Sequence, residues 1–289
     1  RSRRSAPPSG GTERSSRAGG LEVLIYVYAL LATDPGLSID SDEGLEPGHP
    51  VRLVRVDRVA AAVSDVGPDF DTDRLNHQLQ DLDWLSPRAV RHHAIVDRVY
   101  ARSRTILPLA FGTVFRSESS LVRRLTRQQG QLLELLKSVE GKDEWDLKVT
   151  RENARFRAGL LAENEALRSL ERDIEHKPPG TAFMLRKKLE RAQIEEARIV
   201  RRRIRADVQA GLSAHATDSR VDDLPAADGE AAITLELKSA YLLSSEQADG
   251  MERASRELAE RYSSLGYSFE LTGPWPPYSF VGRTSAVLR

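Results

Sequence analysis

The sequence predicts an α+β protein of two domains, the second a modified ferredoxin-like βαββαβ domain with a long helical-hairpin insertion. Two observations lead to this prediction. In the first half of the chain, short apolar runs rich in β-branched residues are followed by segments of helical periodicity. In the second half, a strand, a long helical region, two strands, a helix and a last strand follow one another, which is the order of the split βαβ motif.

The chain of 289 residues divides into four parts. Residues 1–20 hold five Arg and one Glu among Ser, Gly and Pro, without apolar periodicity, and are predicted to be a disordered basic leader. Residues 21–141 are the N-terminal α+β domain. Residues 142–272 are the ferredoxin-like domain, with the helical hairpin at about 151–215. Residues 273–289 are a C-terminal tail rich in Pro and aromatic side chains.

The N-terminal domain is predicted to begin with strands and to continue with helices. Segments that are rich in β-branched and aromatic residues, or that alternate between apolar and polar residues, predict strands at 21–30, 51–56, 59–63 and 105–109. Thr72 has the chemistry of a helix cap, and Ser86-Pro87 that of the start of the next helix. Leucines at helical spacing predict a third helix at about 121–136, and Gly141 follows it.

The hairpin insertion rests on two apolar series at helical spacing. One runs from Phe156 to Ile174 and predicts a single helix, and the other runs from Leu185 to Val208. Pro178-Pro179-Gly180 lies between them and must interrupt the helix. The two helices are therefore expected to fold back on one another and to project from the domain. Strands near 220–224, 231–243 and 267–272, with a helix at 246–265, complete this domain.

The tail is the most unusual segment, because Leu271 to Val281 sets three prolines around a tryptophan before two more aromatic residues. Proline fixes φ and lacks an N–H, so neither a helix nor an inner strand is expected. Such a tail must lie against apolar surface. Packing that seals the core or crosses to the N-terminal domain is the simpler interpretation, and contact with a partner is the alternative. The candidate residues are Trp275, Pro276, Tyr278 and Phe280.

The second hairpin helix is strongly basic. Between residues 183 and 208 it carries nine Lys or Arg against four acidic residues. Nucleic-acid binding is one interpretation, but acidic residues stand at pairing distance and aromatic residues for base stacking are missing. A solvated or partner-facing basic helix is favoured. Its candidate residues are Arg186, Lys187, Arg201, Arg202 and Arg205.

Composition limits the possible functions. Lys plus Arg and Asp plus Glu are both 43, so no overall field attracts nucleic acid or an anionic membrane. The absence of Cys excludes disulfides and thiolate chemistry and favours the cytoplasm. No apolar run reaches the roughly 18 residues that span a bilayer, and no signal peptide is expected. No phosphate loop, dinucleotide turn or serine elbow occurs, so we predict no catalytic, cofactor-binding or metal-binding residues.

Five segments together resemble the gas vesicle protein L/F family, in the order of that family and from about residue 21 to 281. They are Asp81-Leu82-Asp83-Trp84-Leu85 leading to His92 and His93, Thr105 to Phe115, Pro179 to Arg186, Ala240-Tyr241-Leu242-Leu243, and the tail from Leu271 to Val281.

The resemblance implies an accessory or minor structural protein of gas vesicles, the hollow protein shells that give microbial cells buoyancy. It further implies binding to the major shell protein and to other accessory proteins, a location in the cytoplasm and at gas vesicles, and no enzymatic activity. A ferredoxin-like protein that binds a small molecule or regulates another protein is the alternative. Nucleic-acid binding through the basic hairpin is a third possibility, which would weaken steeply with salt.

Overall fold

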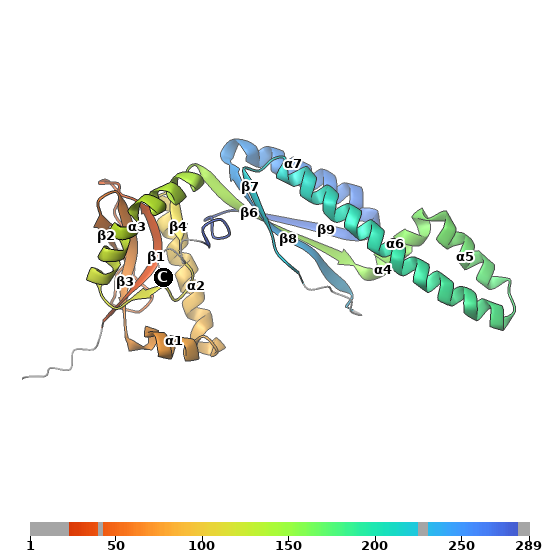
Figure 1. The fold of residues 1–289 in the computed structure, drawn as a ribbon, viewed down its shortest axis with the longest axis horizontal. Helices are drawn as coiled ribbons and strands as arrows, with labels where there is room; N and C mark the ends of the chain where they lie inside the picture. Colours follow the sequence, from red (N-terminus) through yellow and green to blue (C-terminus); the bar gives the residue numbers. More distant parts are fainter. Residues whose placement is uncertain (1–22, 40–42, 225–230, 283–289) are drawn as a thin grey trace, which may run out of the picture.

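The computed structural model describes residues 23–39, 43–224 and 231–282. These residues form two antiparallel sheets joined directly by the chain, with a group of helices extending beyond the second sheet (Figure 1). The predicted leader, residues 1–20, lies outside the described residues.

The first sheet has five strands. Its strand order is β2-β3-β1-β4, and a two-residue strand, β5, also pairs with β1. The strands are β1 (Leu24–Ala32), β2 (Arg52–Val56), β3 (Val59–Val66), β4 (Ile106–Pro108) and β5 (Val114–Phe115). The predicted strands of this half are therefore present. Asp57, between β2 and β3, makes the tight turn with a positive φ of 49°.

Helices cover both faces of this sheet (Figure 1). Tyr26 and Tyr28 of β1 pack in one core with α2 (Leu82–Arg102), whereas Val27 and Leu30 pack in another core with α3 (Glu118–Val139). Because β1 is buried on both faces, its sequence is a continuous apolar run and does not alternate with polar residues. The short helices η1 (Pro68–Phe70) and α1 (Thr72–Gln78) precede α2.

The predicted helix boundary at Ser86-Pro87 is wrong. The structure starts α2 at Leu82, and Pro87 lies inside the helix. Asp81 is the cap, because its carboxylate accepts hydrogen bonds from the backbone N–H groups of Asp83 and Trp84, at 3.0 and 3.3 Å. The cap of α1 is likewise Asp71, one residue before Thr72.

The second sheet has four strands in the order β7-β8-β6-β9, all antiparallel to their neighbours. They are β6 (Lys142–Glu152), β7 (Asp218–Val221), β8 (Ile233–Ser244) and β9 (Tyr267–Trp275). Helix α7 (Ser245–Tyr262), followed by the short η2 (Ser263–Leu265), contributes to one apolar core on this sheet together with the helices that follow β6. Glycine is favoured at 141, where φ is +67° just before β6.

Three helices, and not the two predicted, connect β6 to β7. They are α4 (Asn153–Glu163), α5 (Glu165–Glu175) and α6 (Pro179–Ser213). The single helix predicted from Phe156 to Ile174 is interrupted at Asn164, which has extended backbone and caps α5 by accepting from the N–H of Leu167 at 3.2 Å. Helix α5 and the first part of α6 form an arm that extends past the end of the sheet, whereas the later part of α6 packs on the sheet (Figure 1).

The last strand is longer than predicted. It continues to Trp275 and not only to Thr272, so the strand includes Gly273 and Pro274. Proline is tolerated there because β9 is an edge strand, which among the described strands pairs only with β6. The Pro-rich tail therefore begins at Pro276.

Candidate functional site

The segment after β9 returns to the first sheet. Residues 276–282 lie between the two sheets, beside the start of β6 (Figure 1). We call the contacts among this segment, α2 with the loop after it, β6 and β8 the seam. Its residues are Tyr100, Arg104, Asp143, Glu144, Leu242 and 276–282.

Two neighbouring acids of β6 form the polar part of the seam. Glu144, only 4% exposed, accepts hydrogen bonds from the backbone N–H and the hydroxyl of Ser279, both at 2.7 Å. Asp143 accepts from the hydroxyl of Tyr100 and, at 2.7 Å, from the guanidinium of Arg104. Burial raises the pKa of Glu144 to about 7, although the Ser279 hydrogen bonds oppose this shift. These two adjacent residues of β6 thus bind the tail on one side and the end of α2 with the following loop on the other.

Aromatic and aliphatic side chains form the apolar part of the seam. Tyr278 packs against the core between the first sheet and α2, with its ring 5.4 Å from that of His93. Phe280 and Val281 pack in the core on the opposite face, which also contains Leu242 of β8. Val281 is 2% exposed. Side chains of both sheets therefore share one apolar cluster.

The predicted tail residues are not equivalent. Pro276 is buried and Tyr278 and Phe280 are half-buried, whereas Trp275 is 44% exposed. Gly273 has a φ of +155°, and a Cβ there would lie 2.8 Å from the Trp145 ring. Only glycine permits this close approach. Of the four predicted residues, Trp275 is the one most open to contact from outside.

The sequence segments 81–93 and 105–115 converge on a buried aromatic cluster. His92, at 1% exposed, donates from Nε2 to the carbonyl of Leu109 at 3.1 Å, so its Nδ1 accepts from the Tyr26 hydroxyl at 2.9 Å. The same hydroxyl accepts from the N–H of Gly112 at 3.0 Å. Burial lowers the pKa of His92 to about 4, so the ring is neutral at neutral pH. The Tyr26 hydroxyl and both ring nitrogens of His92 are thus hydrogen-bonded within the fold, whereas the buried Nε1 of Trp84 in the same cluster has no partner among the described residues.

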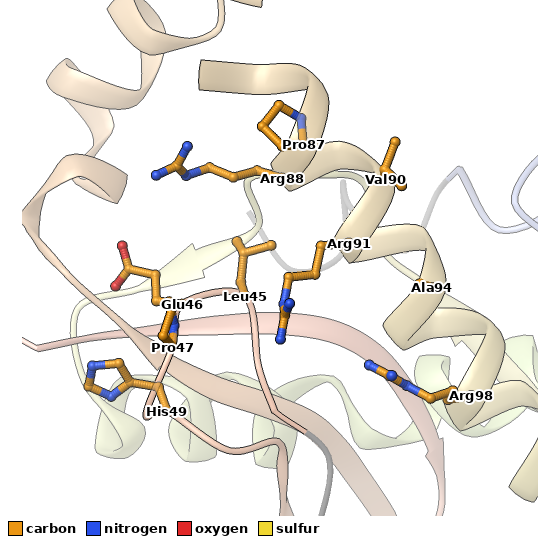
Figure 2. Close-up of a pocket in the computed structure, with 10 residues that line it drawn as sticks. All are labelled: Leu45, Glu46, Pro47, His49, Pro87, Arg88, Val90, Arg91, Ala94 and Arg98. Atoms are coloured by element: carbon orange, nitrogen blue, oxygen red, sulfur yellow. The ribbon is translucent and has the colours of Figure 1, made fainter. Parts of the chain in front are cut away.

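A pocket of about 720 Å³ lies between α2 and the loop before β2 (Figure 2). Figure 2 shows three arginines, Arg88, Arg91 and Arg98, along the side of α2 that faces the loop. The other lining residues are Leu45, Glu46, Pro47, His49, Pro87, Val90 and Ala94.

The charged groups of this pocket have partners within the chain. Arg91 donates to the carbonyl of Gly44 at 2.5 Å and to Glu43 at 2.8 Å, and Arg88 donates to the carbonyl of Trp84 at 3.0 Å. Glu46 accepts from the N–H of Gly67 at 2.8 Å. Arg91 thus fastens the loop to α2, whereas Arg88 bonds within the helix, and the described lining contains no Ser, Thr, Cys or Lys.

The predicted basic residues of α6 fall into different environments. Arg186, Lys187, Arg202 and Arg205 are exposed, and Lys187 pairs with Glu190 at 3.1 Å. Arg201 instead turns towards β8, where its Nε donates to Glu236 at 3.1 Å.

Glu236 is shared with Arg151, whose Nε donates to it at 2.7 Å, and both partners of that pair are about 10% exposed or less at the side chain. Arg201 therefore belongs to a buried ion-pair network that ties α6 to the sheet. The count of Lys and Arg in the sequence identified α6 as basic. It gave no sign of this network, because the members of the network are far apart in sequence.

Neither a metal site nor a membrane-spanning helix has support in the described part of the chain. No group of three or more His, Asp or Glu converges as a metal site would require among residues 23–39, 43–224 and 231–282. In the same ranges, no helix is long and apolar enough to cross a membrane.

These features define a mixed α+β protein built on two sheets, with a projecting helical arm. The model of the family described as gas vesicle synthesis protein GvpL/GvpF matches residues 24–282, so the chain belongs to this family. The resemblance inferred from the five sequence segments is thereby confirmed, and the protein is one of those involved in gas vesicle formation.

Individual relatives agree with this assignment. Gas vesicle protein L of Streptomyces sp. is 29% identical over 268 residues, covering 90% of this chain and 93% of the relative. Gas vesicle protein L2 of Halobacterium salinarum is 28% identical over 260 residues, covering 89% and 90%.

Two solved structures share the fold. Gas vesicle protein GvpF from Anabaena sp. gives a TM-score of 0.64 at 17% identity, and GvpF from Microcystis aeruginosa gives 0.59 at 18%. Each comparison covers 89% of this chain and 98% of the other.

Proposed function

We propose that this protein acts in gas vesicle assembly by binding the major shell protein and other accessory proteins in the cytoplasm. The observation that carries the proposal is the exposed apolar surface of α6. Phe183, Met184, Ile194 and Ile199 are each more than half exposed, on a helix that leaves the body of the protein. Exposed apolar side chains gathered on one element are typical of contact surfaces.

The mechanism we propose is protection of unassembled shell subunits. Subunits that will form a shell expose apolar surface and sheet edges before they assemble, and such surfaces associate without order. An accessory protein that covers them holds the subunits in solution until they join the shell. The contact is non-covalent, so we propose no enzymatic activity.

We further propose that the protein consists of two α+β domains, the second ferredoxin-like with the arm as its insertion. The strand order β7-β8-β6-β9 supports this proposal, as does the chain order of strand, helices, two strands, helix and strand. The seam then joins the two domains, and the tail residues Pro276, Tyr278 and Phe280 serve packing more than partner contact.

Co-purification tests the proposed function. The full chain, tagged at its N-terminus, is isolated under gentle conditions from cells that are assembling gas vesicles. Recovery of the major shell protein, and its loss from the Phe183→Ala, Ile194→Ala double variant, is expected. The matched control is Leu82→Ala, Val90→Ala, which removes from α2 two apolar side chains that are at least as exposed. If the shell protein is absent from all preparations, the proposal is contradicted.

The alternative of a small-molecule-binding protein makes a different prediction. A ligand retained on the purified protein would appear in native mass spectrometry as a mass above that of the chain. The pocket beside α2 is the place where such a ligand would lie.

A further inference from the structure

One face of α6 carries a row of exposed side chains that are mostly cationic. Residues 184, 187, 191, 194, 198, 202 and 205 follow one another at intervals of three or four, so they fall within roughly 80° of the helix circumference over about 31 Å. We call this row the stripe. It contains five cations and two apolar residues, with Glu190 and Glu195 flanking it, and every member is exposed: Met184, Lys187, Arg191, Ile194, Arg198, Arg202 and Arg205.

Most of this charge is not neutralised within the protein. Lys187 has Glu190 beside it. In the described part of the chain, Arg191, Arg198, Arg202 and Arg205 take part in no ion pair or hydrogen bond through their side chains. This differs from Arg201 on the neighbouring flank, which pairs with Glu236. Uncompensated like charges on one helix face repel one another and weaken the helix.

The stripe also differs from an ordinary solvated face in its apolar members. Met184 and Ile194 are 67% and 64% exposed. The opposite side of the helix is buried at Val200, Ile204 and Val208, in the core that α6 shares with the sheet. The stripe is therefore a second face of α6, which carries cations and two apolar side chains. No element of the described chain covers it.

We propose that the stripe docks an acidic amphipathic helix of a protein partner, with carboxylates at intervals of three or four residues. This inference rests on the proposed function, since it names the chemistry of one of its partners. Carboxylates at that spacing meet arginines at the same spacing on a helix packed lengthwise. Apolar side chains on the partner cover Met184 and Ile194.

An anionic polymer or a membrane fits the same face less well. Phosphate contacts gain nothing from Met184 and Ile194, and the described α6 has only Phe183 as an aromatic residue for base stacking. A membrane-bound helix requires a broad apolar face opposite its basic one. In α6 the broad apolar face is already buried against the protein.

The test uses the full chain and a defined probe. The probe is a fluorescent 21-residue helical peptide with Glu and Leu arranged on one face, and the same residues in scrambled order form the comparison peptide. Anisotropy is measured at 50 and 300 mM NaCl. We expect the amphipathic peptide to bind at least tenfold more tightly than the scrambled one, and the affinity to fall with salt.

Variants locate the binding. Arg191→Glu, Arg198→Glu, Arg202→Glu is expected to weaken peptide binding at least tenfold. The matched control, Arg116→Glu, Arg123→Glu, Arg127→Glu, reverses three exposed cations around the start of α3 and is expected to change affinity less than twofold. Met184→Ala, Ile194→Ala is expected to weaken binding about threefold while leaving the salt dependence unchanged. Circular dichroism verifies that each variant is folded.

Three results would overturn the inference. They are equal binding of both peptides, equal loss in the stripe variant and its control, and tighter binding to a 20-nucleotide DNA or to phosphatidylglycerol vesicles than to the helix. The outcome is separable from that of the proposed function, because recovery of the shell protein from cells is scored independently of peptide binding.

Discussion

The seam and the stripe lie towards opposite ends of the second sheet (Figure 1). They differ in whether their charged side chains are buried and bonded or exposed and mostly unpaired. At the seam, Glu144 is almost fully buried and receives two hydrogen bonds from the tail. On the stripe, four arginines stand in solvent without a partner in the described chain. A buried carboxyl group that receives hydrogen bonds, as Glu144 does, helps to hold a single structure, whereas exposed like charges favour contact with molecules of opposite charge. We therefore propose that the seam serves stability and that the stripe serves recognition.

Removal of the tail is the largest perturbation of this comparison. A chain that ends at Trp275 lacks the buried Val281, the half-buried Tyr278 and Phe280, and both donors to Glu144. We expect a loss of about 4 kcal/mol or more in the free energy of unfolding. Urea denaturation followed by circular dichroism measures it. Trp275→Ala is the control, with a loss below about 1.5 kcal/mol, because that side chain is 44% exposed. Equal losses would show that the tail does not hold the sheets together.

The second largest expected effect is the pH dependence of the free energy of unfolding. Because burial raises the pKa of Glu144 from 4.5 to about 7, the folded state binds this proton more tightly than the unfolded state does. Its contribution to stability is complete below pH 4.5 and is lost as the pH rises towards 7. His92 acts in the opposite direction, since its pKa falls from 6.5 to about 4 and its contribution is lost as the pH falls.

The two contributions are separated by Glu144→Gln. The variant keeps a carbonyl acceptor for Ser279 and loses the titration. Its stability relative to the unchanged protein is expected to rise between pH 4.5 and 8 by on the order of 3 kcal/mol. Parallel pH profiles of the two proteins would contradict a buried, protonated Glu144.

A smaller loss is expected from Tyr26→Phe in the aromatic cluster. This change leaves His92 Nδ1 and the N–H of Gly112 buried without their partner. We expect a loss of about 2 kcal/mol. Tyr267→Phe is the matched control, because the buried hydroxyl of Tyr267 has no hydrogen-bond partner within the structure and its removal should be neutral or slightly stabilising. Thermal unfolding of both variants tests the difference, and similar losses would argue against the network.

The smallest effect on stability is expected from the stripe itself. Arg191→Glu, Arg198→Glu, Arg202→Glu should change the free energy of unfolding by no more than about 0.5 kcal/mol, because exposed charges contribute little to folding. A loss as large as that of the tail truncation would mean that the arginines serve the fold and not a partner.

Local sequence patterns predicted most strands and helices, including the extended run of β1 and the basic α6. They failed where two signals compete: Asp81 caps α2 more effectively than Ser86, and Asn164 interrupts an apolar series that looks continuous. The candidate residues of the tail and of α6 were visible as unusual composition.

The partners of those residues were not visible. Glu144 and Ser279 are 135 positions apart, and Arg151 and Glu236 are 85 positions apart. No local pattern joins such residues, because their proximity depends on the whole sheet. Glu236 is the one acid in the otherwise largely apolar sequence of β8 and was therefore a local signal, whereas Glu144 lies among other charged residues of β6 and gave none.

Hydrogen exchange measured by mass spectrometry tests the division between seam and arm most directly. The full chain is compared in isolation and in complex with the gas vesicle proteins that co-purify with it. The account predicts slower exchange on binding across residues 184–205 and no change at 276–282, where exchange is already slow in the isolated protein. New protection at 276–282 with no change on α6 would contradict it, and would make the tail the surface that meets the partner.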